Sequence, residues 1–157
     1  MLAGLCIDTN EFNLKTTERT FEIASYLLEN GASTEIKQEF LKIDINEYLE
    51  RYKYMQNISK LNDGVYFCII DDKKCISSDL AKLADEMMKL EGIKIALALG
   101  NNDEETLISA RSTGENDVSK MMMKLGGGGH FSSAAARVKG EDIKSVLKKL
   151  QNITKGE

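Results

Sequence analysis

The chain has 157 residues, of which 21 are basic and 25 acidic, with one histidine, three cysteines and no proline. Hydrophobic residues make up 42% and charged residues 29%, the composition of a globular protein, and no stretch approaches the ~18 apolar residues that cross a bilayer. The net charge of −4 argues against a uniformly basic nucleic-acid-binding protein, although one cleft can still bind an anion. A single histidine excludes every catalytic centre that needs two or more histidines from this chain.

The three cysteines are Cys6, Cys68 and Cys75, and they form no Cys-x-x-Cys pair. An odd number without paired spacing predicts free, buried thiols in a reducing compartment rather than a disulfide or a zinc site. We therefore expect the protein to be cytoplasmic.

The first third of the chain is predicted to be one strand followed by helices. The apolar run Leu2–Ile7 ends at Asp8-Thr9-Asn10, which indicates a buried strand with Asp8 at its carboxyl end. Apolar residues at helical spacing, each set preceded by a capping Ser, Thr or Asp, predict helices over 18–30, 34–41 and 44 to about 59. The last of these helices is charged, and we interpret it as a linker between two lobes.

From residue 62 onward the pattern changes to short strands alternating with helices. Strands are predicted over 65–70, 93–99 and 106–111, the last two as a hairpin, with a brief strand near 137–138. Helices are predicted over 78–90, 117–125 and 141 to about 152. The predicted fold class is α/β: a helical part with one leading strand over 1–61, then a small domain with a mixed sheet over 62–157.

Four consecutive glycines precede the single histidine, in Gly126-Gly127-Gly128-Gly129-His130. Ordering such a run costs backbone entropy, so a folded protein needs a compensating gain. The gain can be a nest of amide groups that binds a phosphate or carboxylate, whereas the alternatives are a flexible linker or a crowded turn. No Gly-Lys-Ser/Thr ending follows, so the run is not a Walker loop.

Three further side chains are candidates for chemistry. His130 can bind a base or phosphate or transfer a proton, or it can be structural. Arg111 can clamp an anion through its guanidinium, or it can form a surface salt bridge. Asp8 can be a metal ligand at a strand end, or it can serve as a turn or cap residue.

The chain resembles the DHH phosphoesterases in two separate regions. The second part is similar to their DHH-associated C-terminal domain, through Ile108-Ser109-Ala110-Arg111-Ser112, Gly126–His130 and Ala134-Ala135-Ala136. The first part is similar to the end of the DHH catalytic domain, through Leu2–Thr9, Phe12, Arg19-Thr20-Phe21 and Ala24. The sequences of these motifs resemble those of the GdpP-type cyclic di-AMP phosphodiesterases most. They resemble those of the oligoribonuclease/pAp-phosphatase relatives next.

The resemblance implies roles for individual residues. Asp8 matches the aspartate of the last metal motif, a ligand in a two-manganese site that activates water to attack a phosphodiester. Arg111, Gly127, Gly128, Gly129 and His130 match the substrate-binding face, which holds the nucleotide against the metals. The Asp-His-His triplet and the histidine-rich metal motifs of the family are absent from the sequence. We therefore expect a C-terminal fragment that does not bind manganese stably and is inactive as a phosphodiesterase.

The predicted function is the substrate-binding portion of a manganese-dependent phosphodiesterase that hydrolyses cyclic di-AMP to pApA, or short oligonucleotides. The alternatives are a stand-alone nucleotide- or RNA-binding module without catalysis, the oligoribonuclease/pAp-phosphatase type, and a structural domain whose glycines only permit close packing. The expected partner is a cyclic dinucleotide or short oligonucleotide and not long nucleic acid. Association with a membrane is expected only through upstream domains of the parent protein. A homodimer is expected to form through the unpaired edge of the Leu2–Ile7 strand.

Overall fold

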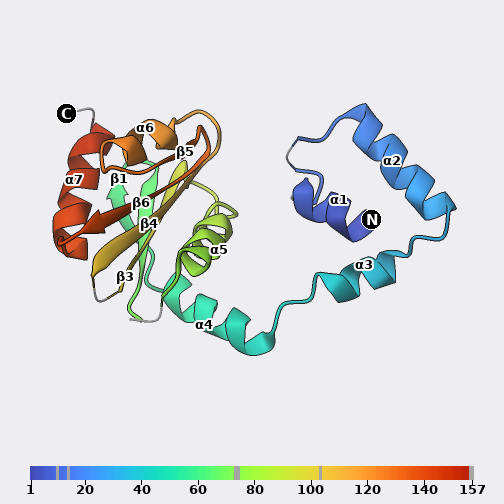
Figure 1. The fold of residues 1–157 in the computed structure, drawn as a ribbon, viewed down its shortest axis with the longest axis horizontal. Coiled ribbons are helices and arrows are strands. Elements are labelled where there is room, and N and C mark those ends of the chain that lie inside the picture. The colour runs from blue at the N-terminus through green and yellow to red at the C-terminus, as the bar shows by residue number, and fades with distance from the viewer. Residues whose placement is uncertain (10, 14, 73–74, 103, 156–157) are drawn as a thin grey trace. The chain divides into compact units, whose positions relative to one another are not determined.

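The computed structural model describes residues 1–9, 11–13, 15–72, 75–102 and 104–155. These form two compact units, Met1–Tyr48 and Leu49–Glu157, which are described separately (Figure 1). Within the described ranges, no helix has both the length and the apolar character needed to cross a membrane.

The first unit is helical from its beginning. Its elements are α1 (Leu2–Asp8), α2 (Glu18–Glu29), α3 (Thr34–Phe40) and the start of α4 (Ile45–Met55). The predicted leading strand is therefore wrong: Leu2–Ile7 is part of a helix. Leu2 and Cys6, one helical turn apart, are buried, and Ile7 is exposed. No strand occurs among the described residues of this unit, so the backbone groups of α1 find their partners within the segment itself.

Local capping explains where the other helices of this unit begin. Thr17 is the N-cap of α2, and its amide donates to Thr20 Oγ1 at 3.0 Å. Ser33 Oγ accepts from the Glu35 amide at 3.1 Å, and Asp44 Oδ1 accepts from the Asn46 amide at 2.9 Å. The predicted helix starts are thus confirmed. The division between the two units falls within α4, which ends at Met55 and not near residue 59.

The second unit contains a six-stranded mixed sheet, which confirms the predicted α/β class. The strand order is β1-β2-β3-β4-β6-β5; β2 and β3 are parallel and the other neighbours are antiparallel. The strands are β1 (Ser59–Asn62), β2 (Val65–Ile70), β3 (Ile95–Asn101), β4 (Glu105–Ser112), β5 (Gly128–His130) and β6 (Ser133–Lys139). The predicted β3–β4 hairpin is confirmed, although Asp103 in its turn lies outside the described residues. The short edge strands β1 and β5 were not predicted.

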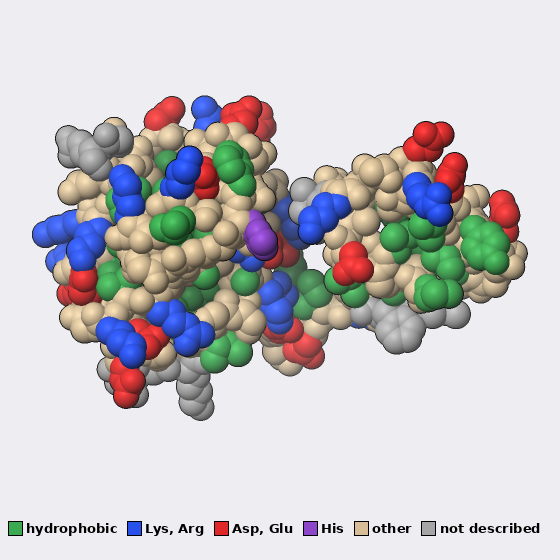
Figure 2. All heavy atoms as spheres, turned by 45° about the horizontal axis from the view of Figure 1, so that its top comes forward, with side chains coloured by type: hydrophobic (Ala, Val, Ile, Leu, Met, Phe, Trp, Pro, Cys, Tyr) green, Lys and Arg blue, Asp and Glu red, His purple; other side chains and the backbone are tan. Residues whose placement is uncertain are grey.

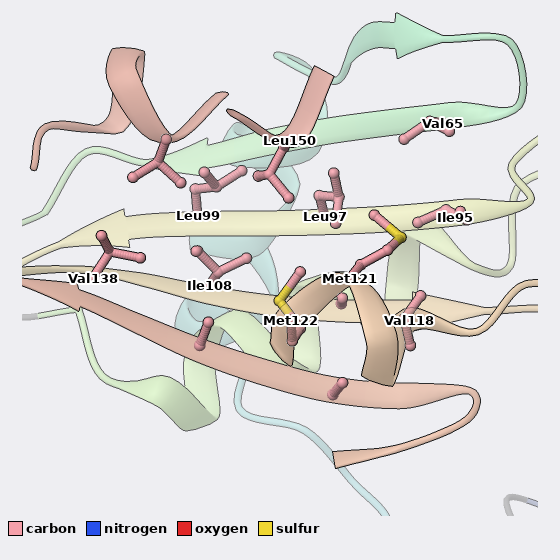
Figure 3. Packing of buried hydrophobic residues seen from close by; sticks show 14 residues of the cluster. Val65, Ile95, Leu97, Leu99, Ile108, Val118, Met121, Met122, Val138 and Leu150 are labelled. Carbon is pink, nitrogen blue, oxygen red and sulfur yellow. The ribbon is translucent and has the colours of Figure 1, made fainter. Parts of the chain in front are cut away.

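Helices cover both faces of this sheet (Figure 1). On one face, α5 (Ser77–Met87) connects β2 to β3 and packs on β3 and β4, so that Leu83 and Met87 meet Ala96 and Ala98. On the other face, α6 (Val118–Met123) and α7 (Ile143–Lys155) pack on the opposite side chains. Figure 3 shows Leu97, Leu99 and Ile108 of the sheet lying against Met122 and Leu150 of these helices.

The cysteines are free and buried, as predicted. The Cys68 thiol donates to the Tyr54 carbonyl at 2.9 Å, and burial raises the pKa of Cys68 to about 11. Burial, assisted by the nearby Asp79 and Asp72 carboxylates, also raises the pKa of Cys75 to about 11.

These raised thiol pKa values predict slow alkylation. At pH 8 only a small fraction of Cys68 and Cys75 is thiolate, and the thiolate is the reactive species. We expect both thiols to react with iodoacetamide at least about a hundred-fold more slowly in the folded protein than in 8 M urea, as peptide mass spectrometry would show. Equal rates in the two conditions would contradict this assignment.

Candidate functional site

One strip of the sheet in the second unit is left open to solvent. Along β6, Ala134, Ala136 and Val138 are buried beneath α6 and α7, whereas the alternate residues Ser133, Ala135, Arg137 and Lys139 point to the other face and are more exposed. On that other face, α5 packs on β3 and β4. We call the exposed face of β6 and β5 beside α5, formed by Gly128, His130, Ser133, Ala135 and Arg137, the open face.

The register of three strands brings the two main candidates into one row on the open face. Arg111 on β4 is directly opposite Ser133 on β6, and Ser133 is directly opposite His130 on β5. Directly opposed residues in antiparallel strands project from the same face of a sheet. Arg111, Ser133 and His130 therefore form a polar row across three strands, and the single histidine is exposed (purple in Figure 2).

Arg111 is held in place by α5 and by its own strand. Its Nε donates to Asp85 Oδ1 at 2.7 Å, and its Nη1 donates to Ser109 Oγ and to the Ala110 carbonyl, each at 3.1 Å. The Arg111 side chain is 18% exposed and that of Asp85 is 58% exposed. In this structure Arg111 therefore forms a surface salt bridge, with Asp85, which is the second of the two roles considered for it. An ion pair with an exposed carboxylate contributes only about 0–1 kcal/mol, so a phosphate group can replace Asp85 at small cost.

The first two glycines of the run end helix α6. Gly126 has a φ of +77°, its amide donates to the Met123 carbonyl at 3.1 Å, and the Gly127 amide donates to the Met122 carbonyl at 2.8 Å. This is the hydrogen-bond pattern of a Schellman C-cap. The interpretation of the run as a nest of free amides is therefore wrong for Gly126 and Gly127, because both amides already have partners.

Gly127 and the strand β5, which begins at Gly128, lie very close to β6. A Cβ on Gly127 would stand 2.1 Å from the Ala135 carbonyl oxygen, and one on Gly129, where φ is +149°, would stand 2.5 Å from the Ser133 carbonyl oxygen. A Cβ on Gly128 would meet nothing within 4 Å. The crowded-turn alternative thus accounts for Gly127 and Gly129, and substrate contact by Gly127, Gly128 and Gly129 stays a prediction.

Asp8 is an exposed residue at the end of α1 in the first unit, not at the end of a strand. Across the described ranges, no group of three or more His, Cys, Asp or Glu side chains is arranged to hold a metal ion. These residues therefore do not fit a manganese site, and we derive no reaction step through a metal. The assignment of Asp8 as a ligand stays a prediction from the resemblance.

One residue of the polar row and three around it were not predicted from the sequence as site residues: Ser133 in the row, and Asp85, Ser109 and Arg137 around it. Ser109 and Asp85 orient the Arg111 guanidinium, and Ser133 and Arg137 complete the open face. A signal for Arg137 was the alternation of charged and apolar residues over 137–139, whereas the three alanines before it give none for Ser133. The structure has one seven-residue strand in place of the brief strand near 137–138.

Most of the second unit matches a known domain family. A model of the DHHA1 domain matches residues 62–156. The chain belongs to the DHHA1 domain family. This confirms the resemblance found in the second part of the sequence. The expected domain boundary after residue 61 stays a prediction.

The DHHA1 domain and the residues before it are similar to two curated phosphodiesterases. The chain is 35% identical over 156 residues to the cyclic-di-AMP phosphodiesterase GdpP of Bacillus subtilis (strain 168), covering 97% of this chain and 24% of the relative. It is 36% identical over 152 residues to the cyclic-di-AMP phosphodiesterase PdeA of Listeria monocytogenes, covering 96% of this chain and 23% of the relative. The chain therefore spans about a quarter of the length of these relatives.

A solved structure shares the fold of the chain. An exopolyphosphatase-related protein from Bacteroides fragilis superposes with a TM-score of 0.80 at 17% identity, over 96% of this chain and 49% of that protein. At this identity the likeness establishes the fold alone.

Proposed function

We propose that the DHHA1 domain of this chain binds cyclic di-AMP, or its linear product pApA, on the open face as the substrate-binding part of a phosphodiesterase. The observation that carries the proposal is the row of Arg111, Ser133 and His130, which sets a guanidinium, a hydroxyl and an imidazole side by side on three strands. The similarity to two cyclic-di-AMP phosphodiesterases supports this choice of ligand.

Each member of the row has a distinct part in the proposed complex. Arg111 exchanges the Asp85 carboxylate for a phosphate oxygen, while Ser109 and the Ala110 carbonyl hold its Nη1 in place. His130 is exposed, so its ring is free to approach the ligand as a hydrogen-bond donor or acceptor. Ser133 adds a hydroxyl between them.

Calorimetric titration with cyclic di-AMP and with pApA tests the proposal. We expect Arg111→Ala and His130→Ala each to weaken binding about ten-fold or more, because each removes a polar contact to the ligand. Lys144→Ala is the matched control: it removes one exposed positive charge from α7, on the opposite side of the sheet, and should change affinity less than two-fold. Unchanged affinity in both site variants, with unchanged circular dichroism, would reject this function and favour a structural role for the glycine run.

We further propose that the 157-residue chain binds the nucleotide without hydrolysing it, and that manganese-dependent hydrolysis belongs to a longer parent protein. The sequence lacks the Asp-His-His triplet, and its one histidine lies in the open face. Incubation with cyclic di-AMP and Mn²⁺, followed by chromatography, should yield no pApA. Steady formation of pApA by the purified chain would refute this statement and leave the binding proposal standing.

A further inference from the structure

We propose that Arg137 is a second phosphate-binding residue, so that the open face selects ligands with two phosphates over ligands with one. The inference rests on the proposed nucleotide binding at Arg111 and His130, and it adds the part of the site that distinguishes a dinucleotide from a mononucleotide.

Arg137 lies on the same face of the sheet as Arg111. Arg137 on β6 is opposite Leu107 on β4, four residues along the strands from the pair of Arg111 and Ser133. Four residues of strand correspond to about 13 Å between the two rows of Cα atoms. The even number keeps both arginines on the same face.

The two arginine side chains both reach helix α5. Arg111 Nε contacts Asp85, and Arg137 Nη2 lies 3.4 Å from Ser77 Oγ. Ser77 and Asp85 both belong to α5, where eight residues span about 12 Å along the helix. Both guanidinium groups therefore lie along the same helix, at a spacing that matches the spacing of their rows on the sheet.

The surface between the two arginines is formed by small residues. The row midway between the two arginines consists of Ser109, Ala135 and Gly128, opposite one another on β4, β6 and β5. Ser109 is buried and bonded to Arg111, whereas Ala135 is exposed and a Cβ on Gly128 would meet no atom within 4 Å. A flat ligand can thus lie over Ala135 and Gly128 without displacing a side chain.

The two arginines differ in how their charge is balanced. Among the described residues, no carboxylate lies within ion-pair distance of Arg137, whose contact with Ser77 is a long hydrogen bond to a neutral hydroxyl. Arg111, in contrast, is paired with Asp85. Arg137 is exposed and has no opposing charge in the part of the chain that the structure describes, and it can swing from Ser77 toward a second phosphate of the ligand held by Arg111. A second anionic group on the same ligand would balance the positive charge of Arg137.

The test compares ligands with one and two phosphates. Displacement of a fluorescent cyclic dinucleotide by AMP, pApA and cyclic di-AMP would be measured for the wild-type chain and for Arg137→Ala. We expect Arg137→Ala to weaken pApA and cyclic di-AMP about five- to ten-fold and AMP less than two-fold. Arg111→Ala should weaken all three ligands.

Lys139→Ala is the matched control, since it removes the same charge from the next position on the same face of β6. It should change each affinity less than two-fold. If Arg137→Ala leaves pApA binding unchanged, or weakens AMP as much as pApA, the second phosphate site is wrong while the Arg111 and His130 site stands. If Arg111→Ala and His130→Ala are also without effect, the proposed function itself has failed.

Discussion

Replacing Gly127 by alanine should lower the free energy of unfolding by about 3 kcal/mol, a larger loss than for any other glycine of the run except Gly129. The added Cβ would stand 2.1 Å from the Ala135 carbonyl oxygen and 2.6 Å from the Ala136 Cα. Both neighbours are backbone atoms of β6, which is paired to β4 along its whole length, so neither can move without disturbing the sheet. Urea unfolding followed by far-UV circular dichroism would measure the loss.

Gly128→Ala is the control for this variant. Gly128 is the next residue and the first of β5, and a Cβ there would have nothing within 4 Å. We expect its unfolding free energy to stay within about 1 kcal/mol of the wild type, since alanine restricts the unfolded chain more than glycine does. Equal losses in the two variants would show that Gly127 does not lie as close to β6 as described.

The second large effect is expected at Leu83 in α5. Its side chain is fully buried against the sheet, in the cluster that includes Cys68, Ala96 and Ala98. Leu83→Ala should cost about 2–5 kcal/mol, because it removes buried methyl groups and leaves a cavity between helix and sheet. The same urea experiment reports the change.

Leu90 provides the matched comparison for Leu83. It follows α5 and is 44% exposed, so Leu90→Ala should change stability by no more than about 0.5 kcal/mol. A small loss for Leu83→Ala would mean that α5 does not pack on β3 and β4 as described. The ion pair of Asp85 with Arg111 would then lose its structural support.

Side-chain capping and continuous apolar runs made much of this fold predictable. Thr17 and Asp117 mark the starts of α2 and α6. The Thr17 amide donates to the Thr20 hydroxyl and the Lys120 amide donates to the Asp117 carboxylate, each within three residues of chain. The buried runs of β2, β3 and β4 are equally local signals. The prediction of a strand over Leu2–Ile7 was wrong because a short apolar run has no clear period of its own. Whether it becomes strand or helix depends on whether a neighbouring strand is present.

The two elements in the glycine-rich region show a different limit. β5 has no side-chain pattern at Gly128 and Gly129, and it exists because β6 offers small residues against which its backbone can pack. The beginning of β6 was missed because Ala134, Ala135 and Ala136 look alike in sequence although they alternate between buried and exposed faces.

The candidate site was predictable as single residues but not as an arrangement. Arg111 and His130 stand out by chemistry and by their neighbours in the sequence. Their alignment through Ser133 depends on the register of three strands, which no local pattern specifies. Asp85 comes from a helix 26 residues earlier in the chain and meets Arg111 only in the folded protein.

The alternation along β6 also bears on how the strand finds its partner. A shift of β6 by one residue against β4 would turn its two faces over, carrying Arg137 and Lys139 into the apolar layer beneath α6 and α7. Burying a guanidinium or an ammonium group there without a partner is strongly unfavourable, whereas Ala134 and Ala136 would tolerate either side. The two cations therefore disfavour the shifted register of β6 during folding. A strand of alanines alone would not distinguish the two registers in this way. In Arg137→Ala, Lys139 still disfavours the shifted register. This variant is therefore suited to measuring binding alone.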